Sequence, residues 1–122
     1  MKFSDLVGLT LETVRGLEAG SYTVHVVATD GRALVMEHEQ NCCEYVAVED
    51  VIGDVQDILG TPILFATEEE STTNPDDVTK DDQDSFTWTF YRLGTVKGTI
   101  VIRWYGTSNG CYSERVNFKE AS

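Results

Sequence analysis

The alternation of side chains in the C-terminal third of the chain constrains the fold more than any other feature. Every second residue of the segment 86–92 is large or basic, and these residues share one face of an extended chain: Phe86, Trp88, Phe90 and Arg92. The segment 96–105 repeats the alternation, with Trp104 expected to pack in the core. A period of two residues is typical of β-strands. We therefore predict a hairpin of two strands that turns at residues 93–95.

Shorter segments extend this prediction to the rest of the chain. Alternating or apolar residues favour further strands at residues 9–17, 21–29, 32–38, 45–48, 63–66 and 111–118. Asp30 and Gly31, between the second and third of these segments, form a strong signal for a tight hairpin turn. A single helical turn is expected at residues 3–8.

One segment changes period. At residues 49–59 the apolar side chains recur at helical spacing, acidic side chains fill the other face, and Gly60 and Pro62 follow. This predicts one short helix packed on the sheet. The expected fold class is therefore α+β: a twisted, mostly antiparallel β-sheet of six to eight strands, one short helix and a long acidic loop.

The long acidic loop is predicted at residues 68–85. This segment holds eight acidic residues and one lysine, and so carries seven of the twelve excess negative charges of the chain. Its polar composition predicts a flexible insert in a single domain spanning residues 1–122. The net charge of −12 disfavours direct binding to nucleic acid, although a local arginine can still hold a small anion.

The N-terminal residues and the cysteines indicate the compartment. The acidic Asp5 and the lack of an apolar stretch argue against a secretory signal, and no segment has the length of a membrane span. Three cysteines cannot close into a complete set of disulfides. We expect a cytoplasmic protein with reduced thiols and no membrane partner.

The densest group of reactive side chains lies at residues 38–44 (HEQNCCE). His38, Cys42 and Cys43 offer an imidazole and two thiols, which are ligand types that zinc prefers, with Cys111 as a fourth candidate. Adjacent cysteines on a strand point to opposite faces, so a structural strand corner is favoured over a metal site. A thiol–imidazole dyad at this corner is the corresponding enzyme hypothesis, but no cysteine-hydrolase signature surrounds it. We assign no catalytic residue and no cofactor.

Residues 103–114 (RWYGTSNGCYSE) are the most suggestive of ligand binding. An arginine supplies a planar fork for phosphate or carboxylate, and aromatic rings supply stacking faces. Together with the neighbouring strand, this segment gives five candidate ligand-binding residues: Arg92, Arg103, Tyr105, Asn109 and Tyr112. The alternative is purely structural, since Asn109 and Gly110 also form a standard hairpin turn. The chain has no glycine-rich phosphate loop or Walker sequence.

Four blocks of the sequence form a pattern, in order along the chain, at residues 38–44, 48–64, 87–98 and 102–118. Together these blocks resemble a small family of bacteriophage and prophage proteins of unknown function. The chain departs from the family pattern at Asn41, where an acid is commoner, and at Cys111, where an aromatic residue is expected. The resemblance implies a phage or prophage origin and carries no assigned reaction or ligand.

Three functional hypotheses follow. The first is a non-catalytic counter-defence or host-modulating factor in the host cytoplasm, which binds a host protein or sequesters a small nucleotide signal, with the five candidate residues at a homodimer interface. The second is an acidic mimic of nucleic acid that occupies a host DNA-binding protein. The third is a metal- or thiol-dependent enzyme that uses His38, Cys42 and Cys43.

Overall fold

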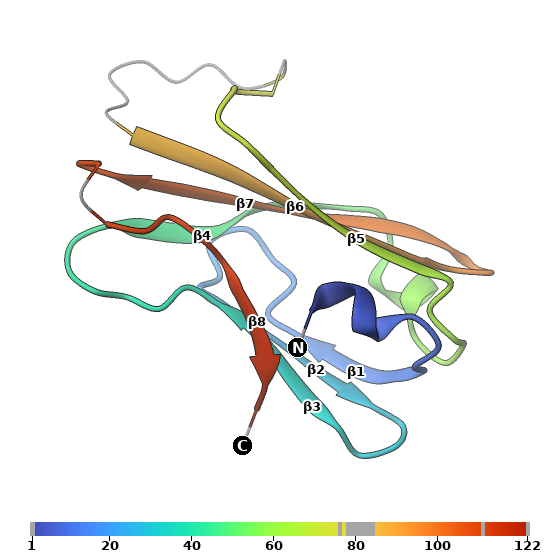
Figure 1. Ribbon diagram of the computed structural model, residues 1–122. Coiled ribbons are helices and arrows are strands. Elements are labelled where there is room, and N and C mark those ends of the chain that lie inside the picture. Colours follow the sequence, from blue (N-terminus) through green and yellow to red (C-terminus); the bar gives the residue numbers. More distant parts are fainter. Residues whose placement is uncertain (1, 76, 78–84, 111, 122) are drawn as a thin grey trace.

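Among the residues that the structure describes, eight antiparallel strands form two four-stranded sheets that lie face to face (Figure 1). This computed structural model describes residues 2–75, 77, 85–110 and 112–121. The first sheet has the strand order β1-β2-β3-β8, and the second has the order β4-β7-β6-β5. The prediction of a mostly antiparallel β fold is confirmed, but the strands divide into the two layers of a β-sandwich.

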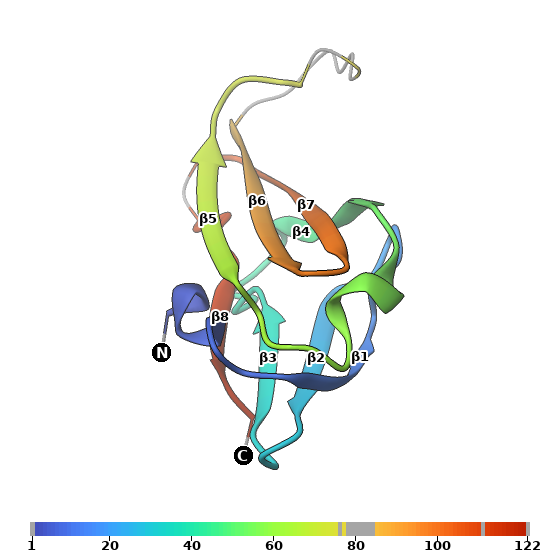
Figure 2. The same cartoon turned by 90° about the vertical axis from the view of Figure 1, so that its right-hand side faces the viewer.

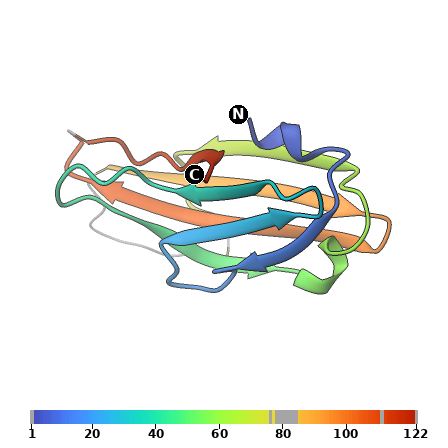
Figure 3. The same ribbon diagram turned by 90° about the horizontal axis from the view of Figure 1, so that it is seen from below.

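The strands of the two layers are broadly aligned (Figure 3). The first sheet consists of β1 (Leu11–Arg15), β2 (Thr23–Ala28), β3 (Ala33–Glu37) and β8 (Asn117–Glu120). The second consists of β4 (Tyr45–Ile52), β5 (Phe65–Ser71), β6 (Ser85–Thr95) and β7 (Gly98–Ser108). Figure 2 shows the second sheet above the first, and the longest strands, β6 and β7, belong to the second sheet.

Alternate residues of the strands fill the core between the sheets. In β2, the side chains of Val24, Val26 and Ala28 are each no more than 3% exposed, as the sequence predicts. In β7, Ile102 and Trp104 face them from the second sheet. Full burial of a valine or isoleucine side chain contributes about 1.5–3 kcal/mol to folding. The apolar alternation therefore fixes which face of each sheet turns inward.

The helix predicted at residues 49–59 is wrong. β4 continues to Ile52, and Val51 packs against the core. The chain then turns at Gly53, whose φ of 110° favours glycine, and only a 3₁₀ turn follows at Val55–Ile58. Branched side chains favour the extended conformation, and pairing with β7 outweighs the helical spacing. A second 3₁₀ turn lies at Phe3–Leu6, and the described residues contain no α-helix. The predicted α+β class is therefore wrong, and the described fold is all-β.

The long C-terminal hairpin is confirmed, but its turn lies further along the chain than predicted. Gly94 and Thr95 remain in β6, and only Val96 and Lys97 connect it to β7. The ring of Phe65 lies over Gly94, where a Cβ atom would be 2.5 Å from a ring carbon. Gly94 therefore permits close packing of β5 on β6 instead of making the turn.

The predicted acidic loop is too long at both ends. Residues 68–71 belong to β5, which pairs with β6 along its whole length, and Ser85 already begins β6. Residues 72–75 and Asp77 follow β5, and the rest of the predicted insert lies outside the described residues. None of the helical turns in the described part of the chain is long and apolar enough to cross a membrane.

Candidate functional site

β6 and β7 place large side chains on the face of the second sheet that points away from the core. In β6 these are the residues predicted to share a face: Phe86, Trp88, Phe90 and Arg92. In β7, Tyr105 lies opposite Trp88, and Arg103 is the next outward residue along the strand. We call Trp88, Arg103 and Tyr105 the outer platform. Each is at most 7% exposed although it faces away from the core, so further parts of the chain must cover it.

The outer platform combines aromatic faces with a cation. The ring centroids of Trp88 and Tyr105 are 4.6 Å apart, and Phe86 stacks on Tyr105 at 6.4 Å. The guanidinium carbon of Arg103 lies 5.4 Å from the centroid of the Trp88 ring, which is within cation–π range. Flat apolar surface beside a fixed positive charge suits a planar ligand that carries an anionic group.

Carboxylates surround the guanidinium of Arg103. Its Nε donates to Oε2 of Glu49 at 2.5 Å. Nη1 and Nη2 donate to the two carboxylate oxygens of Asp77 at 3.1 and 3.2 Å, a bidentate arrangement. The side chain of Arg103 is 7% exposed, whereas that of Asp77 is 66% exposed. A buried cation is thus paired with carboxylates that reach it from the surface.

An irregularity in β4 supplies two of these carboxylates. The register between β4 and β7 shifts between Val48 and Asp50. Such a bulge sets two residues of one strand against one residue of its partner. Glu49 therefore reaches Arg103 directly, and Oδ2 of Asp50 lies 3.9 Å from Nη2. The two acids belong to the segment predicted to be a helix, in which acidic side chains were expected on the face opposite the apolar one.

The ion pairs shift the pKa values of both partners. Hydrogen bonds from Arg103 hold the pKa of Asp77 below its usual value. Burial alone would lower the pKa of Arg103, but its hydrogen bonds to Asp77 and Glu49 outweigh burial and raise the pKa above its ordinary value. Both groups are therefore charged at neutral pH, and Asp77 stays charged in mild acid.

The chain that follows β5 covers the outer platform. It leaves the second sheet on the side away from the first sheet (Figure 1). Oδ1 of Asn74 accepts a hydrogen bond from Nε1 of Trp88 at 3.0 Å, and Asp77 pairs with Arg103. We call residues 72–75 together with Asp77 the covering segment. It meets the indole N–H and the guanidinium of the platform with one side chain each.

A known protein family matches almost the whole chain. The family is described as "Domain of unknown function (DUF7448)", and the match covers residues 4–118. The chain belongs to this family. The predicted membership of a family of unknown function is therefore confirmed. No curated protein and no solved structure matches the chain.

In this DUF7448 chain, three of the five predicted ligand-binding residues share the outer face of the second sheet. Arg103 and Tyr105 belong to the outer platform. Arg92 lies further along β6, 5.2 Å from the centroid of the Phe90 ring, and its Nη1 donates to Oε2 of Glu69 at 3.0 Å. Arg92 is thus a second, more exposed arginine on the same face.

The other two predicted residues lie elsewhere. Asn109 and Tyr112 belong to the exposed connection between β7 and β8, and Tyr112 interacts with Cys42 at the β3–β4 corner. Sequence reasoning missed Glu49 and Asp77 as partners of Arg103. Neither pairing has a local signal in the sequence, because Glu49 and Asp77 lie 54 and 26 residues from Arg103 along the chain.

The β3–β4 corner of the DUF7448 chain is built around a buried carboxylate. The side chain of Glu44 is fully buried, and that of His38 is 3% exposed. Nδ1 of His38 lies 2.6 Å from the carbonyl oxygen of Arg115, and Nε2 is 3.2 Å from Oε2 of Glu44 without good hydrogen-bond alignment. Both ring nitrogens therefore face protein atoms, while Cys42 and Cys43 are exposed. Among the described residues, no three histidine, cysteine or acidic side chains are grouped so that they could hold a metal ion.

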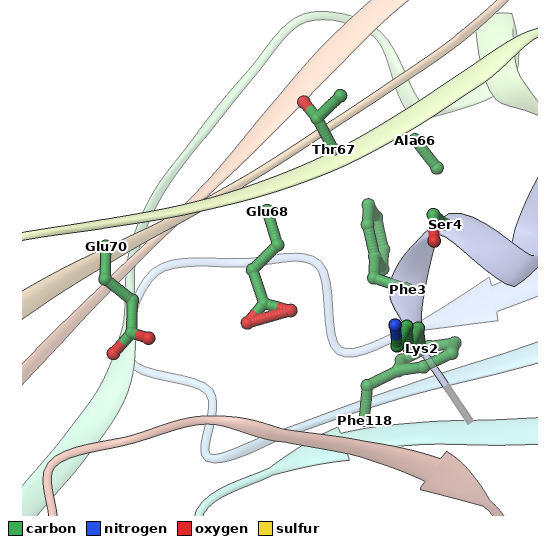
Figure 4. A pocket seen from close by; sticks show the side chains of 8 residues that line it. All are labelled: Lys2, Phe3, Ser4, Ala66, Thr67, Glu68, Glu70 and Phe118. Atoms are coloured by element: carbon green, nitrogen blue, oxygen red, sulfur yellow. The ribbon is translucent and has the colours of Figure 1, made fainter.

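A cavity of about 510 Å³ opens between β5, β8 and the N-terminal 3₁₀ turn (Figure 4). The rings of Phe3 and Phe118 lie at one end of it, and the carboxylates of Glu68 and Glu70 point into it from β5. Burial, together with the nearby Glu70, raises the pKa of Glu68. Among the described residues that line this cavity, Glu68 and Glu70 outnumber Lys2, the one cation, so the cavity is poorly suited to an anionic group.

Proposed function

We propose that this protein is a non-catalytic binding protein of phage or prophage origin, and that the outer platform holds an anionic group of its ligand or partner. The role that fits such a protein is a counter-defence or host-modulating factor in the host cytoplasm. The observation that carries the proposal is the bidentate pairing of Asp77 with Arg103. A carboxylate of the chain itself occupies the position that a phosphate or carboxylate of a ligand would take.

The pairing has the properties expected of an exchangeable contact. Asp77 is mostly exposed to solvent, so water competes for its carboxylate, and Asp77 can leave Arg103 without becoming a buried, unpaired charge itself. Arg103 is the buried partner, and its guanidinium stays fixed by Glu49 when Asp77 leaves. A phosphate, with more charge and more acceptor oxygens than a carboxylate, is a suitable replacement for Asp77.

The aromatic side chains favour a nucleotide over a simple anion. Displacing the covering segment would expose Trp88 and Tyr105 beside the guanidinium of Arg103. A nucleobase could stack on these rings while its phosphate pairs with Arg103. This arrangement supports the version of the proposal in which the protein sequesters a small nucleotide signal.

The proposal is tested with three conservative variants. Native mass spectrometry of protein from bacterial cells first reveals any copurified ligand and the oligomeric state, a homodimer being expected. Calorimetric titration with nucleoside phosphates and cyclic dinucleotides then compares wild type with Asp77→Asn, Arg103→Lys and Asp30→Asn. We expect Asp77→Asn to bind several-fold more tightly, and Arg103→Lys to bind about tenfold more weakly because it lacks the planar fork.

The third variant is the matched control. Asp30→Asn removes the same charge from an exposed carboxylate that pairs with Arg32 in a hairpin turn of the first sheet, so nucleotide affinity should be unchanged. Equal affinities for wild type and Arg103→Lys across all ligands would refute binding at the outer platform. If Asp77→Asn and Asp30→Asn raised nucleotide affinity equally, the gain would come from the change in net charge and not from the outer platform.

One observation favours acidic mimicry of nucleic acid as a second candidate. Glu68, Glu69 and Glu70 lie on the ordered edge strand β5, so part of the acidic segment holds its carboxylates at fixed spacing. Replacing all three by glutamine should then weaken binding to a host DNA-binding protein and reduce its salt dependence. Unchanged binding by the triple variant would exclude this mode.

A further inference from the structure

The β3–β4 corner holds two thiols in a fixed local structure. Oε1 of the buried Glu44 accepts hydrogen bonds from the backbone N–H of Cys42 at 2.8 Å and of Asn41 at 3.2 Å. The side-chain amide of Gln40 donates to the same oxygen at 2.8 Å and to the carbonyl oxygen of Cys42 at 3.1 Å. One buried carboxylate thus accepts hydrogen bonds from three successive residues of the corner, and these hydrogen bonds hold the loop that carries the thiols.

The thiols themselves lie side by side at the surface. Sγ of Cys42 is 2.8 Å from Sγ of Cys43, both residues are exposed, and neither is in a disulfide. The hydrogen bond with Cys43, followed by that with Tyr112, lowers the pKa of the Cys42 thiol, and the same contact between the thiols raises the pKa of Cys43. Cys42 is therefore the thiol that ionises first.

A disulfide between these two residues is disfavoured by the chain. Neighbouring Cα atoms across a trans peptide are about 3.8 Å apart, which is shorter than the usual separation of about 4.4–6.8 Å in disulfides. A ring that contains one additional bridging atom relieves this restriction. The pair is better suited to hold an atom between its sulfurs than to bond directly.

We propose that Cys42 and Cys43 form a dithiol chelate site for trivalent arsenic, as arsenous acid or a monosubstituted arsenical. Soft thiolate ligands select soft, thiophilic centres. A pyramidal arsenic atom takes both sulfurs on one side, and the two sulfurs of this corner lie next to each other. Tetrahedral zinc needs further ligands that the described residues do not group here, because both nitrogens of His38 face Arg115 and Glu44.

The binding reaction is a substitution without electron transfer. An arsenical R–As=O reacts with both thiols, so that two S–H bonds and the As–O bonds break, two As–S bonds form, and one water molecule leaves. The buried Glu44 supports the site as a positioning residue, because it holds the loop and does not touch the arsenic. This site is separate from the outer platform, and the inference does not depend on the proposed function.

Intact-mass spectrometry and competitive titration with phenylarsine oxide test the site. Wild type and Cys111→Ser should each gain one arsenical with loss of one water, and the adduct should survive excess monothiol but not excess dithiol. Cys42→Ser and Cys43→Ser should form no adduct that survives monothiol. Cys111 lies outside the described residues. An adduct in Cys111→Ser would show that Cys42 and Cys43 suffice to bind the arsenical.

Two comparisons separate a built site from the ordinary reactivity of adjacent thiols. Glu44→Gln should bind phenylarsine oxide about tenfold more weakly, the size of effect found when outer partners of a metal ligand are removed. A synthetic peptide of residues 38–45 should also bind more weakly than the folded protein, and it tests the idea even if Glu44→Gln misfolds. A folded protein that binds no more tightly than the peptide, or an adduct retained in Cys43→Ser, would overturn the proposal.

Discussion

The two tryptophans of the second sheet are both fully buried, but they are covered in different ways. Trp104 faces the first sheet and belongs to the apolar core. Trp88 faces outward, and the chain above it is attached by the hydrogen bond of Asn74 and the ion pair of Asp77 with Arg103. The first sheet covers Trp104, whereas the covering segment, which makes polar contacts, lies over Trp88.

This difference separates stability from function in the same sheet. Exposing Trp104 requires the two sheets to part, which is close to global unfolding. Exposing Trp88 requires only that a short segment leaves, and such local openings need less free energy. A binding surface can therefore exist on the outer face without weakening the core.

Truncating each tryptophan gives the largest expected effect. Trp104→Ala should lower the free energy of unfolding by about 3–5 kcal/mol, because it leaves a cavity in the core. Trp88→Ala should lower it by about 2 kcal/mol, since the covering segment can move away and let water in. Urea denaturation of both variants measures the difference. Equal losses would show that the outer face is as much a part of the core as the inner one.

Hydrogen exchange of the two indole N–H groups sharpens the comparison without mutation. We expect the Trp88 indole N–H to exchange about a hundredfold faster than that of Trp104, because local opening of the covering segment suffices to expose it. NMR exchange measurements on the wild type resolve the two signals. Exchange of both groups at the rate of global unfolding would contradict a removable cover.

Lowering the pH should weaken the outer cover before the core. Because Arg103 holds the pKa of Asp77 below its usual value, this carboxylate contributes stability that is present above the unfolded-state pKa of about 4 and is lost as the pH falls through the native pKa. The difference in unfolding free energy between wild type and Asp77→Asn should therefore shrink as the pH falls below about 4. Subtracting the variant removes the titration of all other carboxylates. A difference that does not change with pH would exclude the ion pair as its source.

Removing the neutral contact should have the smallest effect. Asn74→Ala removes the acceptor for the Trp88 indole N–H and should cost about 1 kcal/mol, the net value of one hydrogen bond. Exchange of the Trp88 indole N–H should accelerate, while the Trp104 signal serves as the internal control. If both signals accelerate together, Asn74 stabilises the whole fold and not the cover alone.

Local patterns predicted the strands better than the acidic segments. The outward set on β6 and the alternating core residues of β2 and β7 follow directly from the period of two. The helix at residues 49–59 failed because helical spacing competed with strand pairing, and β7 was available to pair with β4. The residues of this segment do not by themselves show that a partner strand is available, so the sequence could not decide between helix and strand.

The candidate site was predicted only in part, because local patterns do not show where a connection between strands leads. Arg103 and Tyr105 were chosen for the chemistry of one segment, and Arg92 was added from the neighbouring strand. The three residues share a face because they lie at alternate positions of β6 and β7. Asn109 and Tyr112 were grouped with them by nearness in sequence, but the connection between β7 and β8 carries Tyr112 to the corner beside Cys42. Proximity along a chain predicts proximity in space only within one regular element.

The sequence by itself therefore determined which side chains share a face, because strand geometry is local and repeats every two residues. Only the tertiary structure decided which outward side chains are buried. Trp88 and Arg103 lose their exposure to a segment whose nearest described contacts come from Asn74 and Asp77. Burial depends on what lies above a residue, and that is a property of long-range contacts and not of the strand itself.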